Sequence, residues 1–188
     1  MTTHLPDAGR PRVTPLLPAC APALVPADGE LPPRVRAVTD ADLPELHRLD
    51  QEVFQQHAYP YFVLRQFYDL YRDDLLVVDD AGTLRGYVLA GVASDPSRCW
   101  ILGLAIDRKS RHRGLGRLLM TESLRGLCLR GVREVWLTVE PANAAALDLY
   151  LSLGFSRVDR RSDYFGAGSD RVLMVLPLAG AVALSAEA

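Results

Sequence analysis

A short basic segment that contains two glycines, SRHRGLGRLLM (residues 110–120), lies between an apolar run and a leucine-rich run. The apolar run, RCWILGLAID (98–107), is typical of a central β-strand. The leucine-rich run continues to Arg130 and meets Gly131, a residue that commonly ends helices. A strand is thus followed by a basic loop and then by a helix. This order constrains the possible folds more than any other part of the chain, because it places the loop at a helix N-terminus.

The first turn of the predicted helix is suited to an anion. Its amide groups have no partner within the helix, and the helix dipole adds partial positive charge there. Gly114 and Gly116 leave the backbone uncovered. Four basic side chains can surround the same backbone: Arg111, His112, Arg113 and Arg117. The segment therefore indicates a pyrophosphate site, with an ordinary basic turn as the alternative.

Two common nucleotide-binding patterns do not fit this loop. GxxxxGK[ST] is absent, and in GxGxxG the third glycine is replaced by Leu119. Arg111, Gly114 and Gly116 instead match R/Q-x-x-G-x-G/A. In this the loop resembles the coenzyme A loop of the GNAT superfamily of N-acyltransferases.

A second motif follows about thirty residues later, in WLTVEPANAAALDLYLSLGF. It resembles the pattern N-x-x-A-x-x-L-Y-x-x-x-G-F that closes the cofactor site of the same superfamily. The matching residues are Asn143, Ala146, Leu149, Tyr150, Gly154 and Phe155. Asn143 and Tyr150 are seven residues apart and share one helix face. The two motifs occur in the correct order, each after a strand, which argues against coincidence. The resemblance covers essentially all of residues 34–178.

The resemblance implies an α/β (α+β) fold: a GNAT-type mixed, mostly antiparallel β-sheet with flanking helices and a splayed central strand pair. The splayed strands would be residues 98–107 and 133–140, with the pantetheine arm of acetyl-CoA between them. The implied cofactor contacts are Leu104, Ala105 and Ile106 in the first strand, Arg111, His112, Arg113, Gly114, Leu115, Gly116 and Arg117 in the loop, and Asn143 and Tyr150 in the later helix.

Hydrophobic patterns predict the element order β-α-α-β-β-β-α-β-α-β-β and one domain over residues 34–178. Thr39 or Asp40 can cap the first helix. Residues 1–33 contain eight of the thirteen prolines and predict a disordered N-terminal tail. Residues 179–188 are expected to form a flexible C-terminal tail.

Acetyl transfer from a thioester needs a neutral amine, a stabilised oxyanion and a proton for the departing thiolate. By resemblance, Tyr150 would be the acid, and a backbone amide of residues 104–106 would polarise the thioester carbonyl. Asn143 would contact the cofactor or order a water.

The base is less well defined by the sequence. The motifs look most like those of the ribosomal-protein alanine N-acetyltransferases, whose L-E-V-R-x-S-N corresponds to residues 137–143. The glutamate of that pattern falls on Thr138, which cannot deprotonate an ammonium. Glu140 lies on the same strand face, about 6.6 Å farther along. Three hypotheses follow: Glu140 acts through water, a carboxylate or histidine of residues 50–60 replaces the base, or no strong base is used.

Two aromatic segments could form the amine pocket. FQQHAYPYF (54–62) contributes Tyr59 and Tyr61 as candidates, with ordinary packing as the alternative. RRSDYFGAG (160–168) resembles the R-x-N-Y-Y loop of the family, which places Tyr164 where peptide-binding relatives hold the substrate backbone.

The composition agrees with a soluble, cytoplasmic enzyme that needs no metal. The net charge of -2 does not favour nucleic acid as a partner. Cys20, Cys99 and Cys128 are odd in number and widely spaced, which is typical of reduced thiols rather than of ligands or disulfides. No apolar run approaches the length of a membrane span. We expect a monomer or homodimer.

Three functions remain open at this point. The first is acetylation of a protein or peptide N-terminus, which the similarity of residues 154–176 to the alanine acetyltransferases favours. The second is acetylation of a small-molecule amine such as a polyamine, an antibiotic or a metabolite, which Thr138 favours. The third is a non-catalytic domain that binds acyl-CoA for regulation.

Overall fold

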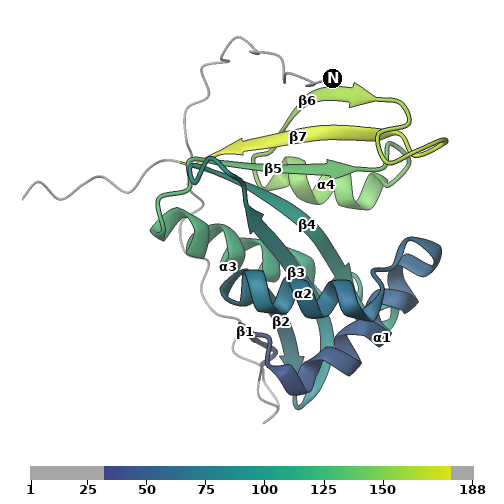
Figure 1. Cartoon of the computed structure of the whole chain (residues 1–188), viewed down its shortest axis with the longest axis vertical. Helices are drawn as coiled ribbons and strands as arrows, with labels where there is room; N and C mark the ends of the chain where they lie inside the picture. The colour runs from purple at the N-terminus through teal and green to yellow at the C-terminus, as the bar shows by residue number, and fades with distance from the viewer. Residues whose placement is uncertain (1–31, 179–188) are drawn as a thin grey trace, which may run out of the picture.

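The computed structural model describes residues 32–178, which form one seven-stranded sheet in the order β1-β2-β3-β4-β5-β7-β6 (Figure 1). The strands are β1 (Arg34–Ala37), β2 (Leu75–Asp80), β3 (Thr83–Val92), β4 (Arg98–Ile106), β5 (Glu134–Val139), β6 (Ser156–Arg161) and β7 (Arg171–Pro177). The helices are α1 (Leu43–Phe54), α2 (Tyr61–Tyr71), α3 (Leu115–Leu129) and α4 (Ala144–Ser152). Short 3-10 turns are η1 (Asp40–Asp42), η2 (Gln55–His57), η3 (Arg72–Asp74) and η4 (Arg108–Ser110).

The predicted element order and fold class are confirmed. Every strand pair is antiparallel except β4 with β5, which run parallel. The predicted tails fall outside the described residues, apart from residues 32 and 33, so the tails and the domain bounds stay predictions.

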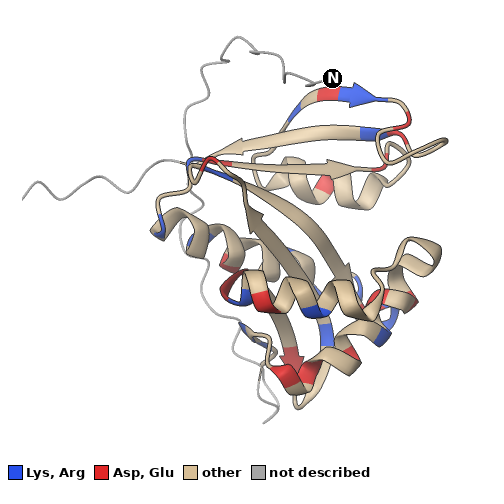
Figure 2. Cartoon of the chain, viewed as in Figure 1, with Lys and Arg blue, Asp and Glu red and all other residues tan. Residues whose placement is uncertain are grey.

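The helices divide the core between the two faces of the sheet. The apolar faces of α1 and α2 pack on β2 and β3, with Leu46, Leu49 and Tyr87 fully buried among them. On the other face, α3 and α4 bury Leu119, Leu127 and other apolar side chains against β3, β4 and β5. Figure 2 shows that β4 and β5 carry charge only at their first residues, so the middle of the sheet is apolar.

Polar contacts fix the start of α1. Thr39 caps the 3-10 turn η1, which leads into α1, and its N–H donates to the Asp42 carboxylate at 2.7 Å. The N-cap position of α1 itself is Asp42 rather than the predicted Thr39 or Asp40. Arg36 of β1 donates to Asp42 at 2.6 Å and to Asp79 of β2 at 2.9 Å. The hydrogen bond from Arg36 holds the pKa of Asp42 well below its usual range. These contacts attach the helix to the edge of the sheet.

Candidate active site

The parallel pairing of β4 with β5 is short. It joins four residue pairs and ends at Ile101 and Leu137. Beyond that point β4 stays paired with β3 as far as Ile106, and β5 stays paired with β7 as far as Val139. The facing edges of the two strands diverge, as predicted, and leave backbone groups without a neighbouring strand (Figure 1). Such an edge can bond an extended ligand in the way that it would bond another strand.

A β-bulge lies where β4 leaves β5. Against β3, Leu89 is opposite Gly103 and Ala90 is opposite Ile101, which leaves Leu102 without a partner. The bulge reverses the alternation of β4. Ile101 before it and Leu104 after it both pack into the core on the α3 side, although they are three residues apart. The edge near the predicted thioester position is therefore shaped by one extra residue.

The N-terminus of α3 lies beyond the end of β4. Gly114 precedes the helix with φ +77° and no side chain caps it. The first intrahelical bond of this turn runs from the Leu118 N–H to the Gly114 carbonyl, so the earlier amide groups of the helix have no helical partner. A Cβ at Gly114 would meet nothing within 4 Å, whereas one at Gly116 would lie 3.4 Å from Leu149 of α4. The loop is thus open at Gly114 and packed at Gly116.

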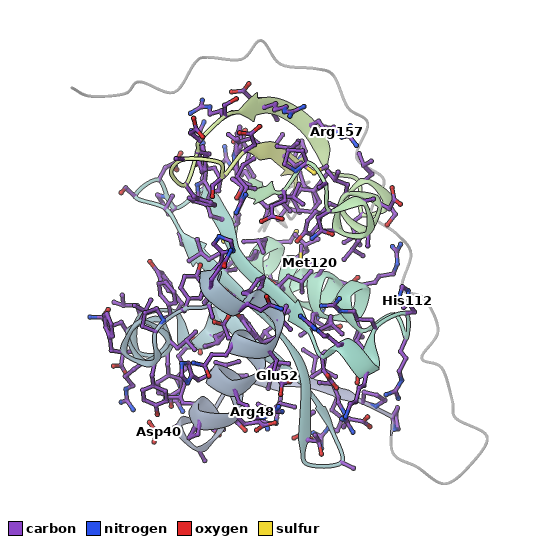
Figure 3. The ribbon with its side chains drawn as sticks, turned by 90° about the vertical axis from the view of Figure 1, so that its right-hand side faces the viewer. Asp40, Arg48, Glu52, His112, Met120 and Arg157 are labelled. Atoms are coloured by element: carbon purple, nitrogen blue, oxygen red, sulfur yellow. The ribbon has the colours of Figure 1, made fainter. Side chains whose placement is uncertain are left out.

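The basic side chains of this loop differ in their contacts. Arg111 and Arg113 are exposed and make only long hydrogen bonds of 3.5 Å, to the Ile106 carbonyl and to the Asp80 carboxylate. Arg117 instead donates to Ser152 Oγ at 2.6 Å, and so joins α3 to α4. Figure 3 shows His112 on the surface loop, while Met120 of the adjoining helix lies in the interior. Of these three arginines, Arg117 makes the shortest hydrogen bond.

Tyr150 lies in α4, and Asn143 is the residue immediately before this helix. Asn143 caps the helix, and its side-chain oxygen accepts from the Ala146 N–H at 3.1 Å. Tyr150 is 7% exposed, with its ring 5.7 Å from that of Phe155. Burial raises the pKa of Tyr150 to about 12. Within residues 32–178 its hydroxyl makes no hydrogen bond, so this buried proton donor is available to a ligand.

Thr138 and Glu140 project from the other face of the sheet. Leu137 and Val139, their neighbours on β5, pack into the core under α3 and α4, so the alternate residues point away from it. Thr138 is half-buried opposite Leu173 of β7. The Glu140 carboxylate is 53% exposed and lies 3.5 Å from the Arg171 guanidinium. The predicted acid and the candidate base therefore lie on opposite faces of the sheet.

The three predicted substrate tyrosines come from the α1–α2 connection, the first residue of α2 and the β6–β7 loop, and both loops lie at the end of the sheet where β4 and β5 diverge (Figure 1). The Tyr59 hydroxyl donates to the Leu102 carbonyl at 3.1 Å, which brings the α1–α2 loop to the bulge of β4. Tyr61 is 45% exposed at the start of α2. Tyr164, in the β6–β7 loop, packs edge-on against Phe165. Tyr59 is thus the one that a hydrogen bond connects to the diverging strands.

One buried carboxylate at this end of the sheet was not predicted as a specific site residue. Asp50 of α1 is fully buried, and it accepts hydrogen bonds from the Tyr87 hydroxyl and the Tyr59 N–H. The sequence does place a carboxylate on the apolar face of this helix. Asp50 follows Leu46 by four residues and Leu49 by one, and therefore lies on the same face as these leucines.

Two structural features agree with the resemblance seen in the sequence. A strand edge that no neighbour covers, continued by an uncapped helix N-terminus, is the arrangement that the resemblance to the coenzyme A-dependent N-acyltransferases implies. The chain belongs to the Acetyltransferase (GNAT) family, whose model matches residues 41–155. It is an acetyl-CoA-dependent N-acetyltransferase, and acetyl-CoA is its co-substrate.

Individual relatives agree with this family. The chain is 30% identical, over 150 residues, to a [ribosomal protein bS18]-alanine N-acetyltransferase of Salmonella typhimurium, covering 77% of this chain and 97% of the relative. The structure of the ribosomal-protein-S18-alanine N-acetyltransferase from Escherichia coli superposes with a TM-score of 0.69 at 24% identity, covering 79% and 96%. A chain of the NatC complex bound to Gag peptide and CoA gives a TM-score of 0.72 at 21% identity, covering 79% and 100%.

The described residues contain neither a membrane-spanning helix nor a cluster of metal-binding side chains. Between residues 32 and 178, no helix combines the length and the apolar character needed to cross a membrane. In the same part of the chain, no group of three or more His, Cys, Asp or Glu side chains is arranged to hold a metal ion.

Proposed function

We propose that this chain acetylates the N-terminal α-amino group of a protein. The observation that carries the proposal is the similarity to the bS18-alanine N-acetyltransferase over 97% of that protein's length. The diverging strands and the α1–α2 and β6–β7 loops lie at one end of the sheet, which suits a flexible N-terminus that enters between the loops. Tyr59, Tyr61 and Tyr164 are the side chains that we assign to this entry.

The cofactor assignment follows from the open edge and the open loop. We place the pantetheine arm along Leu104, Ala105 and Ile106 of β4, and the pyrophosphate at the loop that runs from Arg111 to Arg117. The open space at Gly114 supports this placement, because a phosphate can approach the amides there. The Asn143 side-chain oxygen is used by the helix cap, which leaves its amide N–H groups for the cofactor or for a water.

The chemistry of the proposed transfer requires one bond to form and one to break. The neutral amine nitrogen attacks the thioester carbonyl carbon, and an amide group of β4 stabilises the oxyanion. The C–S bond then breaks, and Tyr150 donates its proton to the departing thiolate. The ammonium proton leaves to the base or to water, and the phenolate recovers a proton from solvent.

The absence of a carboxylate at residue 138 favours an α-amine over an alkyl amine. An α-amino group with a pKa near 7.8 is neutral in roughly one molecule of seven at pH 7. An alkyl amine with a pKa near 10.4 is neutral in roughly one molecule of 2,500. A chain with Thr138 at this position therefore loses far less rate with an N-terminus than with a polyamine or a lysine.

We propose that Glu140 removes the remaining proton through a water, and we expect a pH-dependent effect of Glu140→Gln. At pH 7 the variant should lower kcat/KM about tenfold, because general base catalysis contributes modestly for a partly neutral amine. At pH 9 the loss should fall below about twofold, since the α-amine is then almost wholly neutral. Steady-state rates with a peptide acceptor at the two pH values measure this difference.

The matched control is Glu134→Gln, the same change at the other end of β5, which should have no effect at either pH. Equal losses for Glu140→Gln at pH 7 and pH 9 would contradict the proposal. They would show that breaking the Glu140–Arg171 pair disturbs the site rather than removing a base.

The acceptor class is tested by thiol release from acetyl-CoA with two panels of acceptors. One panel holds short peptides that differ in their first residue, each paired with its N-terminally blocked form. The other holds polyamines, aminoglycosides and free amino acids. We expect turnover with unblocked peptides and at least a hundredfold lower kcat/KM with the amines.

Activity with a blocked peptide that contains lysine, or stronger activity with the second panel, would contradict the proposed acceptor. Thr138, which lacks the proton-accepting group of the relatives' pattern, supports a small-molecule amine only if that amine has a low pKa. A preference within the second panel for amines with a pKa below about 8 would then identify this alternative.

A further inference from the structure

Asp50 is a buried carboxylate with an unusual pair of partners. Its side chain lies among apolar residues of α1, α2 and β3 and is fully buried. No Lys or Arg of residues 32–178 forms an ion pair with it, so two neutral donors satisfy it instead. These are the Tyr59 N–H, at 2.6 Å from Oδ2, and the Tyr87 hydroxyl on Oδ1. A carboxylate in such a place is costly unless it is fully hydrogen-bonded, so its retention calls for an explanation.

Tyr59 and Tyr87, the two residues that donate to Asp50, both lie next to the bulge of β4. Tyr59 continues the connection through its own hydroxyl, which donates to the Leu102 carbonyl at 3.1 Å. Tyr87 lies on the other side, where a Cβ at Gly103 would be 3.3 Å from its hydroxyl oxygen. Asp50 is thus connected to Leu102 through Tyr59 and to Gly103 through Tyr87. These two consecutive residues lie where β4 diverges from β5.

The loop that carries Tyr59 needs such an anchor. Gln55, at the start of the α1–α2 connection, has φ +54°, a left-handed conformation that is uncommon for a residue other than glycine. The hydrogen bond from the Tyr59 N–H to Asp50 holds the far end of the same connection. Without it, the Tyr59 hydroxyl would not be held at the Leu102 carbonyl, which has left its pairing with β5.

We infer that Asp50 is a positioning residue for acetyl transfer: through Tyr59 and Tyr87 it fixes the β4 bulge, and thereby the backbone that orients the thioester beside the acceptor loop. This inference rests on the proposed placement of acetyl-CoA along β4. It does not depend on which amine is the acceptor. Asp50 itself contacts neither the thioester nor the amine, whereas Tyr150 and Glu140 are proposed to exchange protons with the reacting groups.

The test uses Asp50→Asn and Tyr59→Phe, singly and together, in the full chain. Tyr59→Phe keeps the backbone N–H that Asp50 binds and removes only the hydroxyl on Leu102. We expect each single variant to lower kcat at least tenfold per folded molecule. Affinity for CoA, which lacks the acetyl group, should stay within about twofold of the parent while affinity for acetyl-CoA falls. Because both changes break one connection, the double variant should be no slower than the slower single variant.

Tyr68→Phe is the matched control, since Tyr68 is a buried tyrosine of the same core whose ring contacts Arg65 and Arg72 and persists as phenylalanine. It should leave kcat and both affinities unchanged. Losses that multiply in the double variant, or an unchanged ratio of CoA to acetyl-CoA affinity, would overturn the inference. If Asp50→Asn fails to fold, Tyr59→Phe alone decides. If the parent acetylates a different amine, rates are measured with that amine, so an error in the acceptor class is distinguishable from an error about Asp50.

Discussion

Replacement of Tyr150 by phenylalanine is expected to lower kcat by about 10²–10³-fold, in the range that removal of a general acid produces. The ring remains in the core between α3, α4 and Phe155, so the packing of the site is retained. Only the hydroxyl is lost, and it has no hydrogen-bond partner within the described residues. Affinity for acetyl-CoA, measured by calorimetry, should therefore change by less than about twofold.

The pH dependence gives an independent test of the same residue. Burial raises the pKa of Tyr150 to about 12, so the proton-donating form is the neutral phenol and persists at pH 10. Ionisation of Tyr150 should therefore cause no decrease in rate between pH 8 and pH 10. A decrease centred near pH 10 in the parent that is missing in Tyr150→Phe would contradict this description. Tyr68→Phe, with the same chemical change elsewhere in the core, should behave as the parent.

Gly114→Ala is expected to raise the KM for acetyl-CoA by about 10- to 100-fold, since the new methyl group would stand where the pyrophosphate approaches the amides of α3. The added Cβ meets no protein atom within 4 Å, so the effect does not come from a clash inside the fold. The positive φ of +77° adds a folding cost of about 1 kcal/mol for any residue with a side chain.

Gly131 provides the matched control at the other end of the same helix. It has φ +84° and, like Gly114, nothing within 4 Å of an added Cβ. Gly131→Ala should therefore cost a similar amount of stability and leave the KM unchanged. The effect of Gly114→Ala should also vanish with acetylpantetheine, which has no pyrophosphate. A KM for acetylpantetheine that rises as much as that for acetyl-CoA would mean that the loop acts on some other part of the substrate.

The features that the sequence predicted correctly depend on local patterns. The basic loop, the strand before it and the helix after it are contiguous, and their order predicted the helix N-terminus at Gly114. The diverging strands were implied by the resemblance to the GNAT superfamily. The spacing from Asn143 to Phe155 likewise describes a single helix and its end. Such features are set by backbone preferences and apolar spacing within about fifteen residues, which can be read directly.

The features that could not be predicted depend on contacts between distant residues. Leu102 is one of several apolar residues in β4, and nothing near it in the sequence shows that the strand bulges there. Asp50 and Tyr87 are 37 residues apart, and their contact exists only because α1 packs on β3. The bond from Arg117 to Ser152 likewise depends on how α3 meets α4. These contacts are decided by tertiary packing rather than by propensity.

The short pairing of β4 with β5 has a mechanical consequence. Strands β1 to β4 form one antiparallel unit and β5, β7 and β6 form another, with four residue pairs as the hydrogen-bonded seam between them. The seam is thus a short one for the middle of a sheet, and it ends where the two strands diverge. A cofactor that forms hydrogen bonds to β4 and also contacts α4 would connect the two units across this seam. With acetyl-CoA in the proposed position, we expect its binding free energy to add to the free energy of unfolding.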